Sequence, residues 1–579
     1  MILWTTALLP LLMGGLIWTA ASIHGGHRTS RGLIGGAAAT ALLILAALAT
    51  SAALTAGRSA YAWGGGLTLT LAMVPMAKIV AVMIPAIALP IVIWAAAAEE
   101  RDELPRLLGL LVAFTGAMEL LVLAADLLVA AVAWELLGLF SWALIAHHWQ
   151  DKQKVAAANY AFNATRLGGL GLWLAAGAAM ATVGDLQFEA LPTLANSAWA
   201  SWMAGGILAA AASKSAQVIF APWLFRAMEG PSSVSALLHS STMVAAGAWL
   251  LVRLHAPLSS VAWFEPAAMA IGLTTALAGG LSAIYQTDAK RLLAASTSAQ
   301  YGLMFTAAGA GYPAAALVHL IAHAACKALL FLSAGSAIHE AGTHDLRRMR
   351  LGRRMPDLAA ASWIGALALA ALPPLGAAWS KEKIIAATGH VAPWVALLAI
   401  GAGTMSAWYA LRFQTLAYGL GRSGGRSTGG GTETLGVWML AGASLLLGMI
   451  WLTGGNGGLT RVLPGPLPEG KTWELVFSMA AAFTAAALSW LVHRRPIDAA
   501  DGQQASGVIG NWWGIPAMID ALVTRPVESL AHACAVFDRK VVDAGVQMAA
   551  DGASFLSRAV ARVADRKLEE AVERTADGG

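Results

Sequence analysis

Long apolar runs separated by short polar loops form the main pattern of this sequence. Runs of about 20 residues recur up to residue 492, and each is long enough to cross a bilayer core of about 30 Å as a helix. The first run has no basic segment before it, so we interpret it as a span and not as a cleaved signal peptide. The pattern predicts an all-α polytopic membrane protein with about fifteen spans. The predicted spans cover residues 2–22, 32–55, 77–98, 106–125, 127–148, 157–183, 202–225, 233–254, 264–285, 292–310, 315–338, 359–386, 392–413, 434–453 and 473–492.

Lysine and arginine residues in the loops alternate between the two sides of the predicted bundle. One set of loops contains Arg28, Arg31, Arg101, Arg106, Lys152, Lys154, Arg226, Lys290, Arg291, Arg347, Arg348, Arg350, Arg353, Arg354, Arg412, Arg422, Arg426, Arg494 and Arg495. The opposite loops contain little beyond Arg58, Arg253, Arg461 and Lys471. Because loops rich in Lys and Arg face the cytoplasm, we expect a multi-pass protein of a bacterial-type cytoplasmic (inner) membrane, with its N-terminus outside and its C-terminus in the cytoplasm.

Residues 496–579 predict a different kind of element. They contain no stretch of 18 uncharged apolar residues, so we expect no further span there. From Ser529 onward, apolar residues keep helical spacing with charges between them, although Gly545 and Gly552 are expected to weaken the helix. The segment is either an amphipathic, lateral-helix-like element or a partly frayed cytoplasmic tail. As a helix, it has the membrane surface, a partner or the chain's own spans as possible supports.

Composition agrees with this pattern and narrows the chemistry. Hydrophobic residues make up 58% of the 579 residues and charged residues 12%, about half the charged fraction of a soluble protein. Two cysteines, Cys326 and Cys534, are too few for a metal cluster. No Gly-rich dinucleotide motif, Walker loop or multi-cysteine pattern occurs. We therefore expect no cofactor in this chain, and we expect any redox chemistry to belong to a partner.

Several ionisable residues fall inside the predicted spans and not at their ends. Among them are Glu135, Lys214, His239, His319, His323, Lys327 and Lys381. An ionisable group at membrane depth costs a few kcal/mol, so such groups usually pair, face a wet interior and mark ion or proton pathways. The alternative is that each one extends to an interface or satisfies a single neighbour. The serial placement of acid, lysines and histidines favours a proton relay.

The segment "HLIAHAACKALLFL" places three of these residues on one helix face. His319, His323 and Lys327 follow one another at intervals of four, which makes one slanting stripe on a helix of 3.6 residues per turn. Two histidines at this spacing are also typical of a helical zinc site. A protonated lysine is a poor metal ligand, and no carboxylate follows on this face. The relay is therefore favoured over a metal site.

Helix-breaking residues lie beside two of the lysines. Pro222 follows Lys214, and Pro373 and Pro374 precede Lys381. Interrupted helices at corresponding positions of two halves indicate a transport site built from inverted repeats. The two spans are five apart, so two five-helix repeats would have opposite topology. The expected division is 1–105, N-terminal helices; 106–256, first repeat; 257–420, second repeat; 421–495, C-terminal helices; and 496–579, tail.

Five blocks of sequence resemble one family. They are "WELLGLFSWALI" (134–145), "KSAQVIFAPWLFRAMEGPSSVSALLHSSTMVAAGAWLLVR" (214–253), "DAKRLLAASTSAQYGLM" (288–304), "HLIAHAACKALLFLSAGSAIH" (319–339) and "PPLGAAWSKEKI" (373–384). Over about residues 120–412 the chain resembles the antiporter-like subunit L, or subunit 5, of respiratory complex I (NADH-quinone oxidoreductase). That subunit shares its proton-conducting fold with the large subunits of multisubunit sodium/proton antiporters.

The resemblance implies a role for each intramembrane residue. Glu135 and Lys214 would form the input pair, and Lys381 would be the exit lysine toward the outside. The central hydrophilic relay would consist of His239, His319, His323 and Lys327. The resemblance also implies other membrane subunits as partners in a hetero-oligomeric complex, and no nucleic acid. In a complex I-like assembly, NADH, flavin, iron–sulfur clusters and quinone would be bound by those partner subunits.

The sequence departs from the family pattern at several places. The family's Asn-Arg-x-Gly-Asp appears here as "TRLGG" (165–169), so Arg166 is kept and the aspartate is lost. In the family this arginine–aspartate contact modulates the glutamate–lysine pair, so that coupling is expected to differ here. Ala221, Phe225 and Arg226 replace a histidine and a Pro-Asp. The tail resembles the start of the family's long lateral helix, but without a final anchor span.

The favoured function is therefore proton movement by one subunit of a complex I-like NADH-quinone oxidoreductase, a translocase whose redox chemistry lies in other chains. A component of a multisubunit Na⁺/H⁺ antiporter is the first alternative. The membrane subunit of an inorganic-carbon uptake complex, which resembles the same family, is another. A purely structural scaffold would leave the intramembrane charges unexplained.

Overall fold

The computed structural model describes residues 1–23, 30–101, 103–195, 197–420, 431–452, 456–494 and 507–578. Four of the arginines used to predict the orientation, Arg28, Arg422, Arg426 and Arg495, lie outside these ranges. The chain forms two compact units, Met1–Trp513 and Gly514–Gly579.

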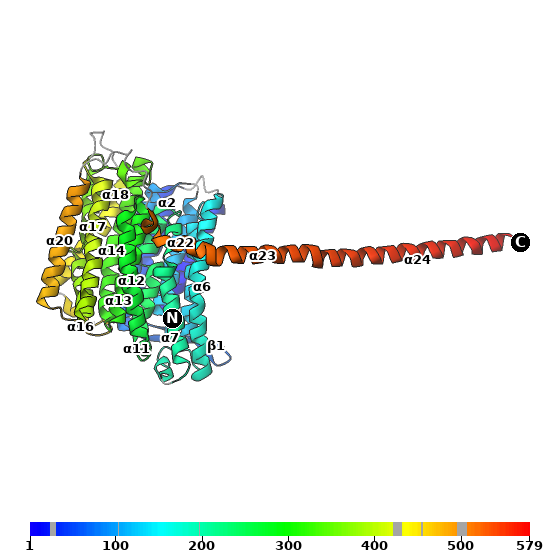
Figure 1. Ribbon diagram of the computed structural model, residues 1–579, viewed down its shortest axis with the longest axis horizontal. Coiled ribbons are helices and arrows are strands. Elements are labelled where there is room, and N and C mark those ends of the chain that lie inside the picture. Colours follow the sequence, from blue (N-terminus) through cyan, green and yellow to red (C-terminus); the bar gives the residue numbers. More distant parts are fainter. Residues whose placement is uncertain are drawn as a thin grey trace. The chain divides into compact units, whose positions relative to one another are not determined.

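The first unit is a bundle of long helices that run side by side (Figure 1). The uninterrupted long helices are α1 (Ile2–Ile23), α2 (Arg31–Thr55), α3 (Pro75–Ala98), α4 (Leu104–Leu123), α5 (Leu127–Ile145), α6 (Lys152–Thr182), α12 (Phe264–Tyr285), α13 (Ala289–Gly309), α14 (Pro313–Ala341), α17 (Pro393–Tyr418), α18 (Gly431–Leu452) and α20 (Thr472–His493).

Three further segments of the bundle are interrupted helices. They are α7 (Ala200–Lys214) followed by η2 (Val218–Phe220) and α8 (Pro222–Ala227), α9 (Ser232–Ser240) followed by α10 (Met243–Arg253), and α15 (Pro356–Leu369) followed by α16 (Gly376–Val391). Short elements connect the rest: η1 (Leu191–Leu194), α11 (His255–Ser259), η3 (Leu346–Arg348), α19 (Asn456–Thr460), α21 (Gly507–Gly510) and η5 (Trp512–Gly514).

Twelve helical segments of the described chain are long and apolar enough to cross a membrane. They confirm a polytopic, all-α membrane protein but not the predicted count of fifteen spans. The three predicted spans that fall short are α6, α13 and the α15–α16 pair. Helices α6 and α13 are long but rich in polar residues, and α15 has only 14 residues. Two of these three carry buried groups of the site described below.

Glycine pairs bring several helices into backbone contact. A Cβ atom on Gly14 of α1 would lie 2.3 Å from the carbonyl oxygen of Gly109 on α4. Gly171 of α6 and Gly206 of α7 are related in the same way, with a Cβ on Gly171 only 2.1 Å from the Gly206 carbonyl. Close packing at small residues is a main source of helix association in lipid. These contacts fix the helices that carry the site.

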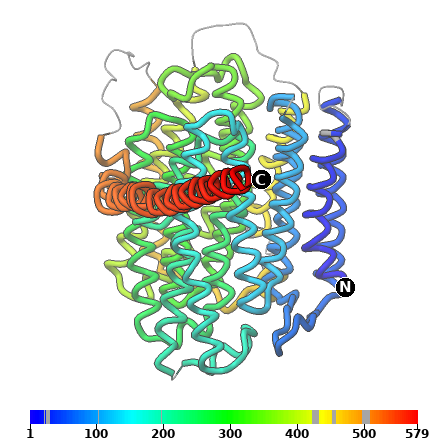
Figure 2. The backbone as a smooth tube through the Cα atoms, turned by 90° about the vertical axis from the view of Figure 1, so that its right-hand side faces the viewer, coloured from blue at the N-terminus to red at the C-terminus, as the bar shows by residue number. Residues whose placement is uncertain are grey.

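A two-stranded antiparallel hairpin, β1 (Arg58–Gly64) and β2 (Leu67–Ala72), lies at the same end of the bundle as the N-terminus (Figure 2). Leu71 forms an isolated β-bridge with Ala124, and the backbone N–H of Ala125 donates to the Thr70 carbonyl at 3.0 Å. The hairpin is thereby attached to the turn between α4 and α5.

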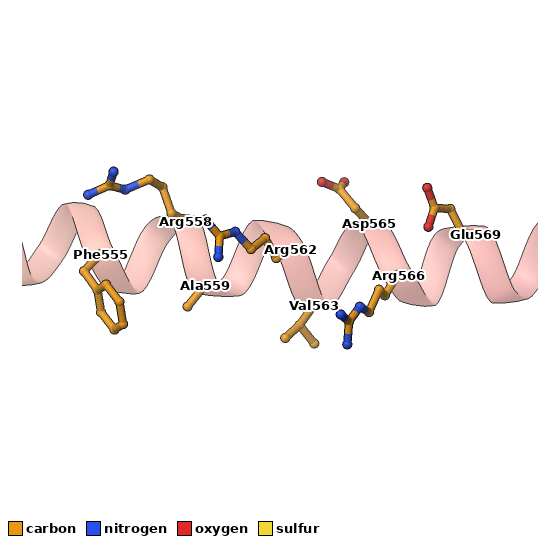
Figure 3. A pocket seen from close by; sticks show the side chains of 8 residues that line it. All are labelled: Phe555, Arg558, Ala559, Arg562, Val563, Asp565, Arg566 and Glu569. Carbon is orange, nitrogen blue, oxygen red and sulfur yellow. The ribbon is translucent and has the colours of Figure 1, made fainter.

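The second unit is a continuous series of helical elements. They are α22 (Ile515–Ile519), the π-helical η6 (Asp520–Thr524), α23 (Arg525–Phe537), the π-helical η7 (Asp538–Asp543) and α24 (Ala544–Ala576). Helix α24 continues through Gly545 and Gly552, which were expected to weaken it. Phe555 and Val563 point to one side of α24 and Asp565 to the other (Figure 3), as the amphipathic pattern predicts.

Candidate proton-relay site

The centre of the site lies on α14, where His319, His323 and Lys327 are all buried. The rings of the two histidines are 6.3 Å apart. The Lys327 Nζ atom donates to the Leu293 carbonyl at 2.9 Å and also to the Ser296 hydroxyl. Both acceptors belong to α13. The predicted stripe therefore exists, and its polar partner is α13. This helix is also one of the three predicted spans that are not long and apolar enough to be counted.

His319 joins α14 to three other helices. Its Nδ1 atom lies 2.9 Å from the Ser380 hydroxyl on α16, and its Nε2 atom lies 3.0 Å from the side-chain oxygen of Gln300 on α13. Gln300 in turn donates to the Tyr409 hydroxyl on α17 at 2.7 Å. Both ring nitrogens therefore have neutral partners. A ring held in this way can pass a proton by exchanging which nitrogen carries it.

His323 connects the stripe to the interruption between α9 and α10. Its Nδ1 atom lies 3.3 Å from the Ser240 carbonyl. The Tyr301 hydroxyl donates to the same carbonyl at 3.0 Å, and the Tyr301 ring packs against the His323 ring with centroids 5.1 Å apart. Ser240 ends α9, so its carbonyl has no full set of helical partners. The interruption thus supplies an acceptor inside the membrane-spanning bundle.

His239 precedes this interruption and is completely buried. Neither of its ring nitrogens has a hydrogen-bond partner in the described part of the chain. Its ring lies between those of Trp223 and Phe331, with centroids 6.1 and 5.8 Å away. Buried polar groups are nearly always hydrogen-bonded, so a buried imidazole without such a bond is unusual and lowers the stability of the fold. Its position between the lysine of α7 and the histidines of α14 is what a relay would require.

Lys381 lies on α16, and its side chain reaches the interruption between α15 and α16. Its Nζ atom donates to the Leu369 carbonyl at 2.7 Å and to the Ser406 hydroxyl at 2.6 Å. The Leu369 carbonyl would bond the backbone N–H four residues later in a continuous helix, but that residue is Pro373, which has none. The predicted helix break is therefore present, and Lys381 satisfies the carbonyl that the break leaves free.

Lys214 is the last residue of α7, at the other predicted break. Its Nζ atom donates to the Trp134 carbonyl at 3.2 Å and lies 5.4 Å from the centre of the Trp134 ring. Glu135 is the next residue on α5 and is only partly buried. No ion pair within 4.0 Å joins Glu135 and Lys214, both of which the structure describes. The two expected partners are close in the fold but not in direct contact.

Arg166 does not join this group. It is exposed on α6, with its guanidinium 5.7 Å from the centre of the Phe162 ring. Gly169 stands at the position of the family's aspartate, and the structure has no room for a side chain there. A Cβ atom on Gly169 would lie 2.9 Å from Nε1 of Trp134. Any side chain there would displace the tryptophan that binds Lys214. The departure from the family pattern is thus built into the packing beside the lysine.

The three lysines share one chemical property. The acceptors of Lys214, Lys327 and Lys381 are carbonyl and hydroxyl oxygens, and none of them is a carboxylate. Loss of a proton from such a lysine leaves no unpaired anion behind. Burial also disfavours the charged form of an amine in general. A row of lysines held by neutral acceptors is therefore able to release and take up protons.

Sequence reasoning missed the neutral members of the site. Ser296, Gln300 and Tyr301 lie on α13, Ser380 on α16, and Ser406 and Tyr409 on α17. The interruption after Ser240 was also missed, because it contains neither proline nor glycine. The available signal was the block "STSAQY" (296–301), which puts five polar residues into a predicted span.

Outside the spans, a cluster of charged residues lies at the predicted cytoplasmic ends of α4 and α5. The Glu103 carboxylate is 3.5 Å from Arg106, 3.3 Å from His147 and 3.0 Å from His148. Burial, followed by the positive charge of Arg106, lowers the pKa of His147 to about 3. His147 is therefore neutral at ordinary pH, and Glu103 has Arg106 as its permanently charged partner.

Comparison with known proteins shows the family to which the chain belongs. A family model described as NADH:quinone oxidoreductase/Mrp antiporter, TM, matches residues 124–406. NADH-quinone oxidoreductase subunit L of Escherichia coli (strain K12) is 33% identical over 439 residues, which are 72% of this chain and 71% of that protein. This chain belongs to that family of antiporter-like membrane subunits. The predicted resemblance is confirmed.

Other members of the family are similar over different lengths. A probable K⁺/H⁺ antiporter component of Rhizobium meliloti (strain 1021) is 36% identical over 60% of this chain, which spans 36% of that protein. A chain of the Mrp complex from Dietzia sp. DQ12-45-1b has a TM-score of 0.77 at 26% identity, covering 95% of this chain and 63% of that one. A chain of respiratory complex I from Thermus thermophilus, with a TM-score of 0.71 at 22% identity, shares the fold over 84% of this chain and 100% of that one.

Proposed function

We propose that this antiporter-like subunit conducts protons through a row of buried groups within the membrane. The observation that supports the proposal best is the set of polar contacts that links interrupted helices through α14. His323 contacts Ser240 beside His239, and His319 contacts Ser380 beside Lys381. Intramembrane ionisable groups that face the bundle interior usually mark ion pathways.

Trp223 connects the remaining lysine to this row. Its indole N–H donates to the Ser213 carbonyl, next to Lys214, at 2.8 Å, and its ring packs against His239. The proposed order is Glu135, Lys214, His239, His323, His319 and Lys381. Lys327 lies beside the row on α14, where its charge acts on the neighbouring histidines. Arg166, exposed on α6, is proposed to act on Glu135 only through charges outside this chain.

The proposal includes fifteen membrane crossings, arranged as two inverted repeats over 106–256 and 257–420. Support comes from the two lysines, which both lie at helix interruptions in the seventh and twelfth predicted spans. The N-terminus is proposed to lie outside and the C-terminus in the cytoplasm, because the Lys- and Arg-rich loops lie on the cytoplasmic side in such proteins.

The assembly is proposed to be a complex I-like NADH-quinone oxidoreductase, whose partner subunits would bind the redox cofactors. Coverage of 71% of the E. coli subunit L supports it. A multisubunit cation/proton antiporter is the second candidate, supported by the TM-score of 0.77 with a chain of the Dietzia Mrp complex over 95% of this chain. Identification of the subunits that copurify with this chain separates the two: flavin and iron–sulfur proteins support the first, small antiporter subunits the second.

Proton transport into vesicles containing the assembled complex tests the relay. We expect Lys214→Ala and Lys381→Ala to lower the initial rate by about 10² or more, the usual effect of removing a proton-transfer group. Lys383→Ala is the matched control, because Lys383 follows Lys381 on α16 but pairs with Glu382 at 3.1 Å. Unchanged transport in the first two variants would rule out the relay.

A further inference from the structure

Three acidic side chains of the described residues are buried in the first unit: Glu119, Asp126 and Glu474. Two of them have structural roles. The Asp126 carboxylate accepts the Thr70 and Val129 backbone N–H groups at 2.6 and 2.7 Å. One Glu474 oxygen accepts the Lys471 backbone N–H at 2.9 Å, which caps α20.

Glu119 has no such role. Its side chain is 0% exposed, and neither carboxylate oxygen has a hydrogen-bond partner among the residues that the structure describes. An ionised carboxylate in an apolar interior costs far more free energy than a neutral acid, and no basic side chain of the described residues lies within ion-pair distance of it. Even a neutral acid loses about 1–3 kcal/mol for each unmade hydrogen bond. A glutamate here weakens the fold and caps nothing, so its presence calls for a functional explanation.

The position of Glu119 indicates what that explanation is. It lies four residues before the end of α4 at Leu123, about 6 Å from that end at 1.5 Å per residue. The hairpin covers this end, and Thr70 on β2 contributes a buried hydroxyl that also has no hydrogen-bond partner among the described residues. Beyond it, Gln187 donates to the Thr68 hydroxyl at 3.0 Å and accepts from Arg58 at 2.7 Å. The Arg58 side chain is 47% exposed, so polar groups run from the surface through the hairpin that covers this end of α4.

We propose that Glu119 is a proton-binding site in its own right, held as a neutral carboxylic acid and exchanging its proton with the outer aqueous phase beneath the β1–β2 hairpin. It lies outside the row from Glu135 to Lys381 and belongs to the α1–α4 part of the bundle. The ligand is a proton and not a metal ion, because the described residues contain no group of three or more His, Cys, Asp or Glu side chains that could hold a metal. The outer aqueous phase is the side of the membrane on which the N-terminus is proposed to lie.

A hydrophobic carbodiimide tests this directly, because it reacts only with protonated carboxyl groups. The acid proton moves to a carbodiimide nitrogen while a carboxyl oxygen bonds to the central carbon, so the adduct gains the full reagent mass and nothing leaves. The complex is labelled in sealed vesicles with dicyclohexylcarbodiimide, and the peptide containing Glu119 is followed by mass spectrometry. Labelling of the unmodified protein avoids any question of whether a variant folds.

We expect an adduct on Glu119 that forms at least about tenfold more slowly when the outer pH is raised from about 6 to about 9 at constant inner pH. Glu119→Gln removes this adduct, and Glu474→Gln leaves it. No adduct on Glu119, or a rate that follows only the inner pH, overturns the proposal. A rate independent of both pH values means a permanently protonated acid and overturns it as well. Proton transport measured in the same vesicles separates these outcomes from failure of the relay.

Discussion

The two lysines at helix interruptions, Lys214 and Lys381, have corresponding places in the topology but different surroundings. At the end of α7, the carbonyls that the break exposes are bonded by other side chains: Trp223 donates to Ser213 and Gln217 donates to Ser215, both within 2.8 Å. Lys214 is left to reach across to α5. At the end of α15, the freed Leu369 carbonyl is bonded by Lys381 itself.

This difference shows that one kind of break can serve two purposes. Lys381 is part of the local structure, since its ammonium caps the helix end and no acid of the described chain is paired with it. Lys214 is held by Trp134 on a neighbouring helix, beside the partly exposed Glu135. Its charge state is therefore open to influence from the side of the bundle where Glu135 lies.

Among the tests of this difference, replacement of each lysine by methionine is expected to change proton transport most. Lys214→Met and Lys381→Met should both lower proton transport by about 10² or more. Only Lys381→Met should also lower the free energy of unfolding, by about 1–3 kcal/mol, because the Leu369 carbonyl loses the ammonium and keeps only the Ser406 hydroxyl, at 3.3 Å, as a donor. Transport in vesicles and thermal unfolding of the purified complex measure the two effects. Equal losses of stability would show that the two breaks are equivalent.

Removal of the acid beside Lys214 is expected to have the next largest effect. Glu135→Gln keeps the shape of the side chain but removes its negative charge, and should lower the initial transport rate roughly tenfold. Glu382→Gln, next to Lys381, is the control and should leave transport nearly unchanged, since Glu382 pairs with Lys383. If Glu382→Gln had the larger effect, Lys381 would be the lysine under acidic control.

Disruption of the link between His319 and Tyr409 should reduce transport to a smaller extent. Gln300→Leu removes the amide that contacts both groups, and we expect a severalfold loss because the protons retain the path through Ser380. Gln414→Leu is a matched control: Gln414 is also buried and accepts from Ser362 at 2.6 Å, away from the row. It should cost stability and spare transport. The opposite result would place the path through α17 near Gln414.

The smallest expected effect is on the pH dependence of stability, and it concerns His147 at the predicted cytoplasmic end of α5. Burial, and then Arg106, lowers the pKa of His147 to about 3, whereas an unfolded histidine has a pKa of about 6.5. Stability from His147 is therefore complete above about pH 6.5 and is lost as the pH falls toward 3, because the unfolded chain takes up the proton first. The maximum slope is about 1.4 kcal/mol per pH unit.

Melting temperatures of the purified complex at several pH values between about 7.5 and about 5, a range that spans the pKa of an unfolded histidine, measure this effect. His147→Gln should flatten the decline on acidification, and His344→Gln, whose histidine is 55% exposed, should flatten it less. A variant with the same decline as the unmodified protein would show that His147 is not held neutral by the fold.

Much of this architecture could be predicted from the sequence. Apolar runs indicated the helices, and prolines marked the breaks beside Lys214 and Lys381. A spacing of four residues placed His319, His323 and Lys327 on one face. All of these signals are local, since helix periodicity and proline geometry depend on residues within one or two turns.

The partners of those groups were decided only by the tertiary structure. Lys327 binds α13 across 34 positions in the sequence, and Lys214 binds α5 across 80. The break after Ser240 contains no proline or glycine, and only the structure shows that Glu119 has no hydrogen-bond partner among the described residues. Burial and hydrogen bonding depend on which helices meet. In the interior of the bundle, a carboxyl group without a hydrogen-bond partner costs much more free energy than a paired one, because no water replaces the missing partner.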